Sequence, residues 1–427
     1  MQIEHYSVVV IGGGPAGLAA AIAAKKELDR SESDKKIVVL ERGNELGGIL
    51  NQCIHNGFGL QFFNEELTGP EYADRFIKKL KELNIEYRLD CMVTKTDEDK
   101  VLEIADGTNG IYKIKADAII LAMGCRERSR GALNIAGTRP SGVFTAGAVQ
   151  HYVNIEGYGT GRTVVILGSG DIGLIMARRL TLEGVRVLMV CELLPYSSGL
   201  RRNIVQCLDD YDIPLKLSHT VVEIKGKERL TGVVVAQVNE NLQPVSGTEE
   251  SVECDTLLLS VGLIPENELT RLMGINMDEI SGGPVVDSDM QTSLGGVFAG
   301  GNTVHVHDLA DNVSVESELA GRSAAQYVLQ KLANGVKAPI LTGNNVRYVV
   351  PQYLNVSNET VGKKTKVYFR VKAPAVNVEI KLTVFCIDGN SPVKTKRAIA
   401  VSPGEMEFVE IEHSSGIDSC RIEVDCL

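Results

Sequence analysis

The sequence predicts an α/β fold with two Rossmann-like dinucleotide-binding domains, the second inserted in the first, plus a C-terminal small β-sandwich-like module. The main observation is a glycine fingerprint, G-x-G-x-x-G, that occurs twice, each time between an apolar strand pattern and a helical pattern. A second observation is the change to alternating, β-branched segments after residue 343. One fingerprint is a weak signal, but two in the same context indicate two bound dinucleotides. The copies are Gly12, Gly14 and Gly17, and Gly168, Gly170 and Gly173.

The first fingerprint follows the run Val8–Ile11, which is typical of a buried parallel strand. Gly12 permits a tight turn, Gly14 lets the backbone approach a pyrophosphate, and Gly17 lets the next helix pack close to the strand. We expect that helix over residues 16–28, where its first N–H groups and its dipole favour an anion.

A carboxylate completes the first motif. The fingerprint predicts an acidic ribose ligand at the end of the second strand, about 20 residues further on. The run Lys36–Leu40 has the pattern of that strand, and Glu41 follows it directly. The alternative for Glu41 alone is a solvated acid at a strand end.

The second fingerprint repeats this order, with a strand at Thr163–Leu167, a helix at Asp171–Leu182 and a strand that leads to Glu192. A carboxylate there accepts hydrogen bonds from a free 2′-hydroxyl and repels a 2′-phosphate, which favours NAD(H) over NADP(H). Arg201 and Arg202 folding back toward the site is the alternative. The expected contacts are Gly168, Gly170, Asp171, Ile172, Gly173, Glu192 and Gly262.

Composition argues against several other classes of protein. The chain has 427 residues, 44% hydrophobic and 23% charged, as in an ordinary globular protein of two or three domains. A formal net charge of −11 argues against binding to nucleic acid or to an anionic membrane. The first residues lack the basic region of a signal peptide, and the uncharged stretch 8–24 fits the dinucleotide turn better than a membrane span. We therefore expect a cytoplasmic protein without a membrane span.

The nine cysteines show no CxxC, CxC or CxxxxC spacing. This pattern predicts mostly buried thiols in a reduced compartment. It also argues against a cysteine-ligated iron–sulfur cluster or structural zinc, and we expect no metal site.

An apolar strand pattern that ends in a glycine turn closes each dinucleotide-binding segment, at residues 116–124 and again at residues 254–262. We expect the first domain at 1–150 and 281–335, the inserted domain at 151–280 and the β module at 343–427. The last helix of the first domain is expected over 311–331. The β module has no evident catalytic cluster, which favours an interface or capping role.

The fingerprint with Glu41, the strand closing on Met123-Gly124 and the late segment Phe298–Gly301 together resemble the two-dinucleotide-domain flavoproteins, which include the pyridine nucleotide–disulfide oxidoreductases. The resemblance covers about residues 5–330 and implies FAD on the first domain and NAD(P)H on the inserted one. It implies FAD contacts at Gly12, Gly14, Pro15, Ala16, Gly17, Glu41, Arg42, Gly47, Gly48, Ala122, Gly124, Gly301, Asn302, Asn312 and Val313.

Two parts of this FAD assignment go beyond the fingerprint. The family usually has Asp where this chain has Asn302, which accepts the same hydrogen bond without a charge. The alternative for Asn302 is a turn residue that leads into a helix. By analogy with the family, the backbone of 312–317 is expected to stabilise the reduced flavin from a helix N-terminus.

A narrower resemblance rests on the strings LGGILNQCIHNGFG, GCRERSRG, FTAGAVQ and SVGLIPEN. They are similar to the flavoprotein that accompanies anaerobic glycerol-3-phosphate dehydrogenases and to subunits of hydrogen cyanide synthase, opine oxidase and heterotetrameric sarcosine oxidase. This implies a partner redox protein or dehydrogenase subunit, and the wider family leaves a homodimer open. Several of these relatives carry a cysteine-rich iron–sulfur segment that this chain lacks, so a partner must supply any cluster.

The catalytic candidates are two small groups. Cys53 and His55 follow Gly47-Gly48, where the disulfide reductases place their redox cysteines. A single cysteine there makes a disulfide relay unfavourable and leaves a sulfenic acid or a packed thiol beside the flavin as alternatives. His305 and His307, with Asp308, follow the late glycines, and we favour proton handling or flavin-pocket structure over loop packing and over a metal.

Three functional hypotheses follow. The chain is an FAD enzyme that moves electrons between NADH and an acceptor, a component that oxidises an amine, opine or polyol directly, or a flavin-bearing scaffold or redox sensor.

Overall fold

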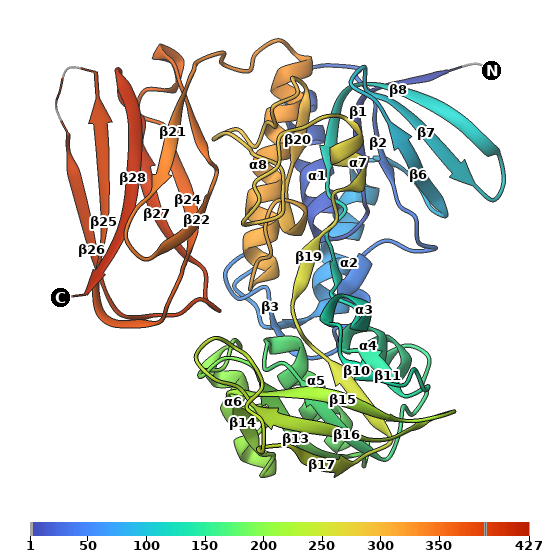
Figure 1. Ribbon diagram of the computed structural model, residues 1–427. Coiled ribbons are helices and arrows are strands. Elements are labelled where there is room, and N and C mark those ends of the chain that lie inside the picture. Colours follow the sequence, from blue (N-terminus) through green and yellow to red (C-terminus); the bar gives the residue numbers. More distant parts are fainter. Residues whose placement is uncertain (1–2, 388, 390, 427) are drawn as a thin grey trace. The chain divides into compact units, whose positions relative to one another are not determined.

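A computed structural model of the chain describes residues 3–387, 389 and 391–426 (Figure 1). It divides into two compact units, Met1–Cys125 with Pro265–Leu427, and Arg126–Ile264. The second unit is thus an insertion in the first. No helix in the described part is long and apolar enough to cross a membrane.

The unit boundaries differ from those expected at 150/151 and 280/281. Strand β11 (Val143–Thr145) pairs with β18 (Thr256–Leu259) in the sheet of the inserted unit, and the buried face of α4 (Ala146–Asn154) joins that unit's core. On the other side, Met273 and Ile275 belong to the core of the first unit. The observed boundaries instead follow directly after the strand-and-glycine segments at 116–124 and 254–262.

A seven-stranded sheet forms the centre of the first unit, in the order β5-β2-β1-β8-β7-β6. The seventh strand, β20, pairs with the end of β8 on the side opposite β1. Strands β5, β2, β1, β8 and β20 pair in parallel, whereas β7 pairs antiparallel with both β8 and β6. The bounds are β1 Glu4–Ile11, β2 Ile37–Leu40, β5 Glu86–Arg88, β6 Cys91–Thr96, β7 Val101–Asp106, β8 Gly110–Leu121 and β20 Val297–Ala299. The smaller elements are η1 Gly48–Gln52, β3 Asn56–Phe58, β4 Leu67–Thr68, α2 Gly69–Glu82, α7 Glu268–Leu272 and η3 Gly301–Thr303.

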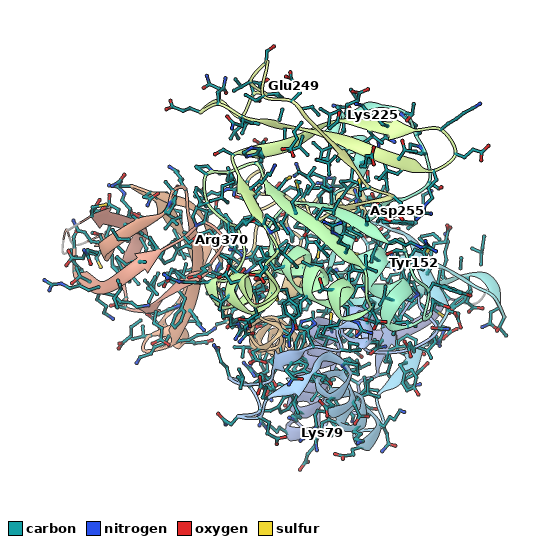
Figure 2. The ribbon with its side chains drawn as sticks, turned by 90° about the horizontal axis from the view of Figure 1, so that it is seen from below. Lys79, Tyr152, Lys225, Glu249, Asp255 and Arg370 are labelled. Atoms are coloured by element: carbon teal, nitrogen blue, oxygen red, sulfur yellow. The ribbon has the colours of Figure 1, made fainter. Side chains whose placement is uncertain are left out.

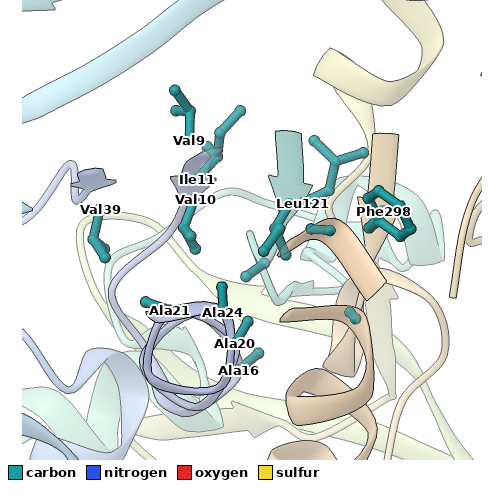
Figure 3. Packing of buried hydrophobic residues seen from close by; sticks show 14 of the residues in the cluster. Val9, Val10, Ile11, Ala16, Ala20, Ala21, Ala24, Val39, Leu121 and Phe298 are labelled. Carbon is teal, nitrogen blue, oxygen red and sulfur yellow. The ribbon is translucent and has the colours of Figure 1, made fainter. Parts of the chain in front are cut away.

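Helices α1 (Pro15–Arg30) and α8 (Ala310–Val328) lie side by side in the first unit (Figure 1). Helix α1 faces β1 with alanines, which allow a close approach to the strands (Figure 3). A Cβ added to Gly321 would lie 2.1 Å from the carbonyl oxygen of Ala20, so α8 is packed directly on the backbone of α1. This contact sets the positions of both helix N-termini.

The inserted unit has a parallel five-stranded sheet in the order β11-β18-β12-β13-β14 and a four-stranded sheet in the order β10-β15-β16-β17. Strand β12 and helix α5 have the bounds expected from the sequence. The bounds are α3 Arg130–Leu133, β10 Ala136–Gly137, β12 Thr163–Leu167, α5 Asp171–Leu182, β13 Arg186–Glu192, α6 Arg201–Cys207, η2 Asp209–Tyr211, β14 Leu215–Leu217, β15 His219–Gly226, β16 Leu230–Gln237 and β17 Glu250–Glu253. The short strands β9 Cys125–Glu127 and β19 Leu263–Pro265 stand at the crossings between the units.

The C-terminal module is a two-sheet β structure with its own apolar core, as expected. One sheet has the order β23-β21-β28-β25-β26 and the other β22-β24-β27. It begins before residue 343, because β21 pairs in parallel with β28. The bounds are β21 Val336–Thr342, β22 Val346–Val350, β23 Tyr353–Val356, η4 Asn358–Thr360, β24 Lys364–Val371, β25 Ala375–Cys386, β26 Val393–Val401, β27 Glu407–Glu412 and β28 Ile417–Cys426.

Candidate functional site

Three parallel strands of the first unit end in one row. Ile11 of β1 is in register with Leu121 of β8, and Leu121 is in register with Ala299 of β20. The first fingerprint, the closing strand and the late glycine segment therefore begin at neighbouring points of one sheet edge. Ligands of open α/β sheets bind at this carboxyl edge.

The three glycines of the first fingerprint have different neighbours. A Cβ at Gly12 would lie 2.3 Å from the carbonyl oxygen of Ala122, and one at Gly17 would lie 1.8 Å from that of Gly12. A Cβ at Gly14 would meet nothing closer than the Cα of Gly48, at 3.9 Å. The protein's own packing requires glycine at the outer positions but not at Gly14. Gly14 therefore leaves room at the N-terminus of α1, where the backbone N–H groups could receive a pyrophosphate.

The late glycine segment completes this surface. A Cβ at Gly301 would lie 2.9 Å from Cβ of Ala16 and 3.0 Å from Cγ1 of Val313. The sequence-predicted residues at the starts of α1 and α8 are therefore in contact through Gly301. Gly47 and Gly48 lie at the start of η1, and Gly48 faces Gly14.

Glu41 is held at the fingerprint by backbone N–H groups. Its carboxylate accepts hydrogen bonds from the N–H groups of Gly13 at 2.6 Å and Gly43 at 2.7 Å. Each oxygen thus accepts one of these bonds, and a carboxylate oxygen has two lone pairs. The half-buried Glu41 keeps acceptor capacity for ribose hydroxyls. Arg42, next to Glu41 in the sequence, is exposed, and Pro15 is half-buried.

The inserted unit repeats the edge arrangement. Leu167 of β12 is in register with Leu259 of β18 and Cys191 of β13. A Cβ at Gly168 would lie 2.0 Å from the carbonyl oxygen of Ser260, whereas a Cβ at Gly170 would meet nothing closer than Ser198 Oγ, at 3.8 Å. The middle glycine again has room on its open side, at the N-terminus of α5. Gly173 packs like Gly17, with a Cβ 2.7 Å from the carbonyl oxygen of Gly168.

Glu192 occupies the position that corresponds to Glu41 but is only 6% exposed. Its Oε2 accepts hydrogen bonds from the N–H of Ser169 at 3.0 Å, the hydroxyl of Ser169 at 2.5 Å and the hydroxyl of Ser198 at 3.3 Å. Its Oε1 accepts one from the N–H of Leu194 at 3.1 Å. Most of the acceptor capacity of the Glu192 carboxylate is therefore taken by hydrogen bonds within the protein.

Other predicted residues of the second site lie around α5. Asp171 accepts hydrogen bonds from the N–H of Leu200 at 2.8 Å and the amide of Asn203 at 2.6 Å. It thus holds the start of α6, whose first residues Arg201 and Arg202 are exposed. Ile172 is half-buried and Gly262 is exposed after β18.

Cys53 and His55 follow η1, which begins beside Gly14. Both side chains are half-buried; the Cys53 thiol donates to the carbonyl of Ile49 at 3.2 Å, and the ring of His55 lies 5.2 Å from that of Phe58. All nine cysteines lie within the described residues and are thiols there.

The side chain of Asn302 is hydrogen-bonded to other residues of the protein. Its side-chain oxygen accepts a hydrogen bond from the N–H of His307 at 3.0 Å, and its amide donates to Cys125 Sγ at 3.4 Å. Beside it, the hydroxyl of Thr303 accepts from the N–H of Gly124 at 2.9 Å. These contacts hold the late segment against the end of β8, with Ala122 and Gly124 nearby.

The predicted polar cluster divides into two. His305 and His307 are buried and turn toward Glu316 of α8; His305 Nε2 lies 2.9 Å from Glu316 Oε2, and His307 Nε2 lies 3.3 Å from Oε1. Burial lowers the pKa of His305 to about 4, so its imidazole is neutral near pH 7. Glu316 Oε1 also accepts the N–H of Gly301 at 2.8 Å, which connects the histidines to the late glycine segment.

Asp308 turns instead toward the β module. It pairs with Arg370 of β24 and accepts the N–H of Met406 at 2.7 Å. Figure 2 labels Arg370 in the module. Arg370 also donates to the carbonyl of Val306 at 3.0 Å. Sequence patterns missed Arg370 and Glu316, because neither lies in a motif and only the fold brings them to the late segment.

Asp311 is a further residue that sequence reasoning missed. Its carboxylate accepts hydrogen bonds from the N–H groups of Gly59 at 3.0 Å and Gln61 at 2.8 Å, in the segment after Cys53. It lies in the first turn of α8, beside the half-buried Asn312 and the buried Val313. The predicted helix start at residue 311 is close to the observed Ala310.

Comparison with known proteins places the chain among flavoproteins. A family model described as pyridine nucleotide-disulphide oxidoreductase matches residues 6–338. The chain is 28% identical to thioredoxin reductase of Listeria monocytogenes, over 76% of this chain and 94% of that protein. It is 26% identical to hydrogen cyanide synthase subunit HcnB of Pseudomonas protegens, over 76% and 70%. It is also 26% identical to one of the subunits of opine oxidase of Agrobacterium tumefaciens, over 77% and 66%.

Solved structures have the same fold. Thioredoxin reductase of Lactococcus lactis superposes with a TM-score of 0.61 at 24% identity, covering 76% of this chain and 99% of that one. Thioredoxin reductase of T. acidophilum superposes with a TM-score of 0.61 at 22% identity, covering 77% and 100%. The chain therefore belongs to the pyridine nucleotide-disulphide oxidoreductase family and is an FAD- and NAD(P)-dependent oxidoreductase.

Proposed function

We propose that the chain transfers hydride or electrons between NAD(H) and an acceptor or partner redox protein through FAD, without a disulfide in the chain. The observation that carries this proposal is the repeated open glycine. Gly14 and Gly170 have room that the protein does not fill, each at the N-terminus of a helix and each near a strand-end glutamate. This is the arrangement that holds a dinucleotide pyrophosphate.

The first site would hold FAD. The fingerprint loop and Gly48 would receive the pyrophosphate, Glu41 would accept the ribose hydroxyls, and the segment from Gly301 to Val313 would receive the flavin end. FAD supplies a ring that accepts a hydride from NADH and passes electrons on one or two at a time. The protein's part is to orient the two cofactors and to exclude competing reactions.

A disulfide relay is not part of the proposal, although thioredoxin reductases are among the relatives. Such a relay needs two neighbouring thiols, and no two cysteines have the CxxC, CxC or CxxxxC spacing. The Cys53 thiol donates a hydrogen bond to the carbonyl of Ile49 in η1, which is typical of a packed thiol. Electrons would leave through the flavin or a partner.

The second site would favour NAD(H) over NADP(H). A 2′-phosphate beside Glu192 would place a second negative charge next to a buried carboxylate, which is costly. Measuring flavin reduction by NADH and NADPH tests this preference. Glu192→Ala should narrow the preference for NADH, and an unchanged ratio would show that Glu192 does not set it.

Anaerobic flavin reduction by different donors tests the proposal. NADH should bleach the flavin absorbance rapidly in the purified protein. Bleaching by glycerol 3-phosphate, an amino acid or an opine, but not by NADH, would favour the second candidate, a dehydrogenase component. The similarity to HcnB and to the opine oxidase protein supports that candidate, since both are named as subunits. Slow reduction of the flavin by every donor would exclude both enzyme candidates and favour the third hypothesis, a flavin-bearing scaffold or redox sensor.

A further inference from the structure

The histidine–glutamate cluster next to the late segment has the composition of a metal site. His305 and His307 lie between η3 and α8, and Glu316 lies in the second turn of α8. One ligand atom from each residue can be chosen so that all lie within 4.8 Å of one another. All three side chains are buried. The sequence showed only the histidine pair, and the fold supplies the third ligand.

The cluster leaves polar atoms without partners. Neither ring nitrogen of His307 has a hydrogen-bond partner among the described residues, although Nε2 lies 3.3 Å from Glu316. Nδ1 of His305 and the hydroxyl of Tyr368 are also buried without partners there. Tyr368 lies over both histidines, with ring centroids 5.9 and 5.6 Å away. A buried polar atom without a hydrogen-bond partner is costly in a protein interior, so the arrangement points to a ligand.

We propose that His305, His307 and Glu316 bind one divalent transition-metal ion of the Zn²⁺ class. Two imidazole nitrogens and one carboxylate oxygen are a ligand set that such ions take. When the ion binds, the proton of His305 moves from Nε2 to Nδ1, which frees the Nε2 lone pair. The neighbouring charges of Asp308 and Arg370 balance each other, so the cluster keeps the single negative charge of Glu316 to offset the cation.

The ion would lie beside both the late segment and the module. Glu316 accepts the N–H of Gly301 in the late segment, and Tyr368 belongs to β24 of the module. Glu316 and Tyr368 also line a cavity of about 360 Å³ beside the cluster. Lys363, Lys364 and Lys366 line the same cavity, and their charges should slow the entry of a cation.

The test is metal content and Zn²⁺ binding in the full-length flavoprotein. Protein is analysed as purified, and again after removal of metal with a chelator and long incubation with Zn²⁺. We expect about one tightly held ion per chain, and at least tenfold weaker binding in His307→Gln and Glu316→Gln. His413→Gln is the matched control, because His413 is buried and hydrogen-bonded to Thr365 outside the cluster. Folding is checked by circular dichroism, since the chain has no tryptophan.

A second measurement does not depend on the variants. X-ray absorption at the zinc edge of the loaded wild-type protein should show nitrogen and oxygen ligands with imidazole scattering. Sulfur ligands would assign the ion to cysteines and overturn the proposal. The absence of stoichiometric binding by the wild type, or equal affinity in folded His307→Gln, would overturn it as well.

Discussion

The two fingerprint sites have the same backbone plan but use their glutamates differently. In both, the strand-end acid accepts the N–H of the residue after the first glycine and the N–H two residues after itself. Glu41 makes only these two bonds among those resolved, whereas Glu192 also accepts two serine hydroxyls. Glu41 thus has more capacity for a ligand, and Glu192 does more to hold its own loop. We therefore expect the two glutamates of the same motif to contribute differently to binding of their dinucleotides.

The largest expected difference is between glycines of one fingerprint. Gly17→Ala places a methyl group against the carbonyl of Gly12 and should destabilise the first unit by about 3 kcal/mol. Gly14→Ala meets no protein atom closer than 3.9 Å, so the apoprotein should keep its stability while FAD affinity falls at least tenfold. Calorimetry of the apoproteins and fluorescence titration with FAD measure both effects. Equal destabilisation by the two substitutions would contradict the assignment of Gly14 to a ligand.

The second fingerprint allows the same comparison for the nucleotide. Gly170→Ala should leave FAD content unchanged and raise at least tenfold the NADH concentration that half-saturates flavin reduction. Stopped-flow absorbance measures this dependence, with Gly131→Ala, at a glycine that has room and lies outside both fingerprints, as the control. Loss of FAD from Gly170→Ala would mean that the two sites are assigned the wrong way round.

The glutamates sharpen the comparison further. Glu41→Gln should weaken FAD binding by about 1–2 kcal/mol, roughly tenfold, and should cost less stability than the change at Glu192, because it interrupts one backbone hydrogen bond at a half-buried position. Glu192→Gln should instead lower the free energy of unfolding by about 1–3 kcal/mol, because a buried amide cannot accept all four bonds. Thermal unfolding with and without cofactor separates these effects. A purely binding effect at Glu192 would reverse our account of the two acids.

The smallest effect is expected at Cys53. Cys53→Ser should keep NADH-driven reduction of an artificial dye within about twofold, because the hydroxyl can donate to the same carbonyl. Steady-state dye reduction measures it, and loss of that half-reaction would overturn the packed-thiol interpretation.

The parts that sequence predicted best are those that depend on local patterns. Strand β12 and helix α5 were located to the residue, because strand, glycine turn and helix follow one another without interruption. The strand-end positions of Glu41 and Glu192 were predicted for the same reason. Glu316 was not, since it lies inside a helix where a glutamate is ordinary, and only the position of α8 brings it to the histidines. The partner of Asp308, Arg370, comes from a separate module and could not be foreseen.

We propose that FAD on the first unit and NAD(H) on the inserted one exchange a hydride. An anaerobic titration of the FAD-loaded protein with NADH tests it most directly. We expect the flavin absorbance to disappear with about one NADH consumed per FAD, since each hydride carries two electrons. A flavin that stays oxidised in excess NADH would contradict the account.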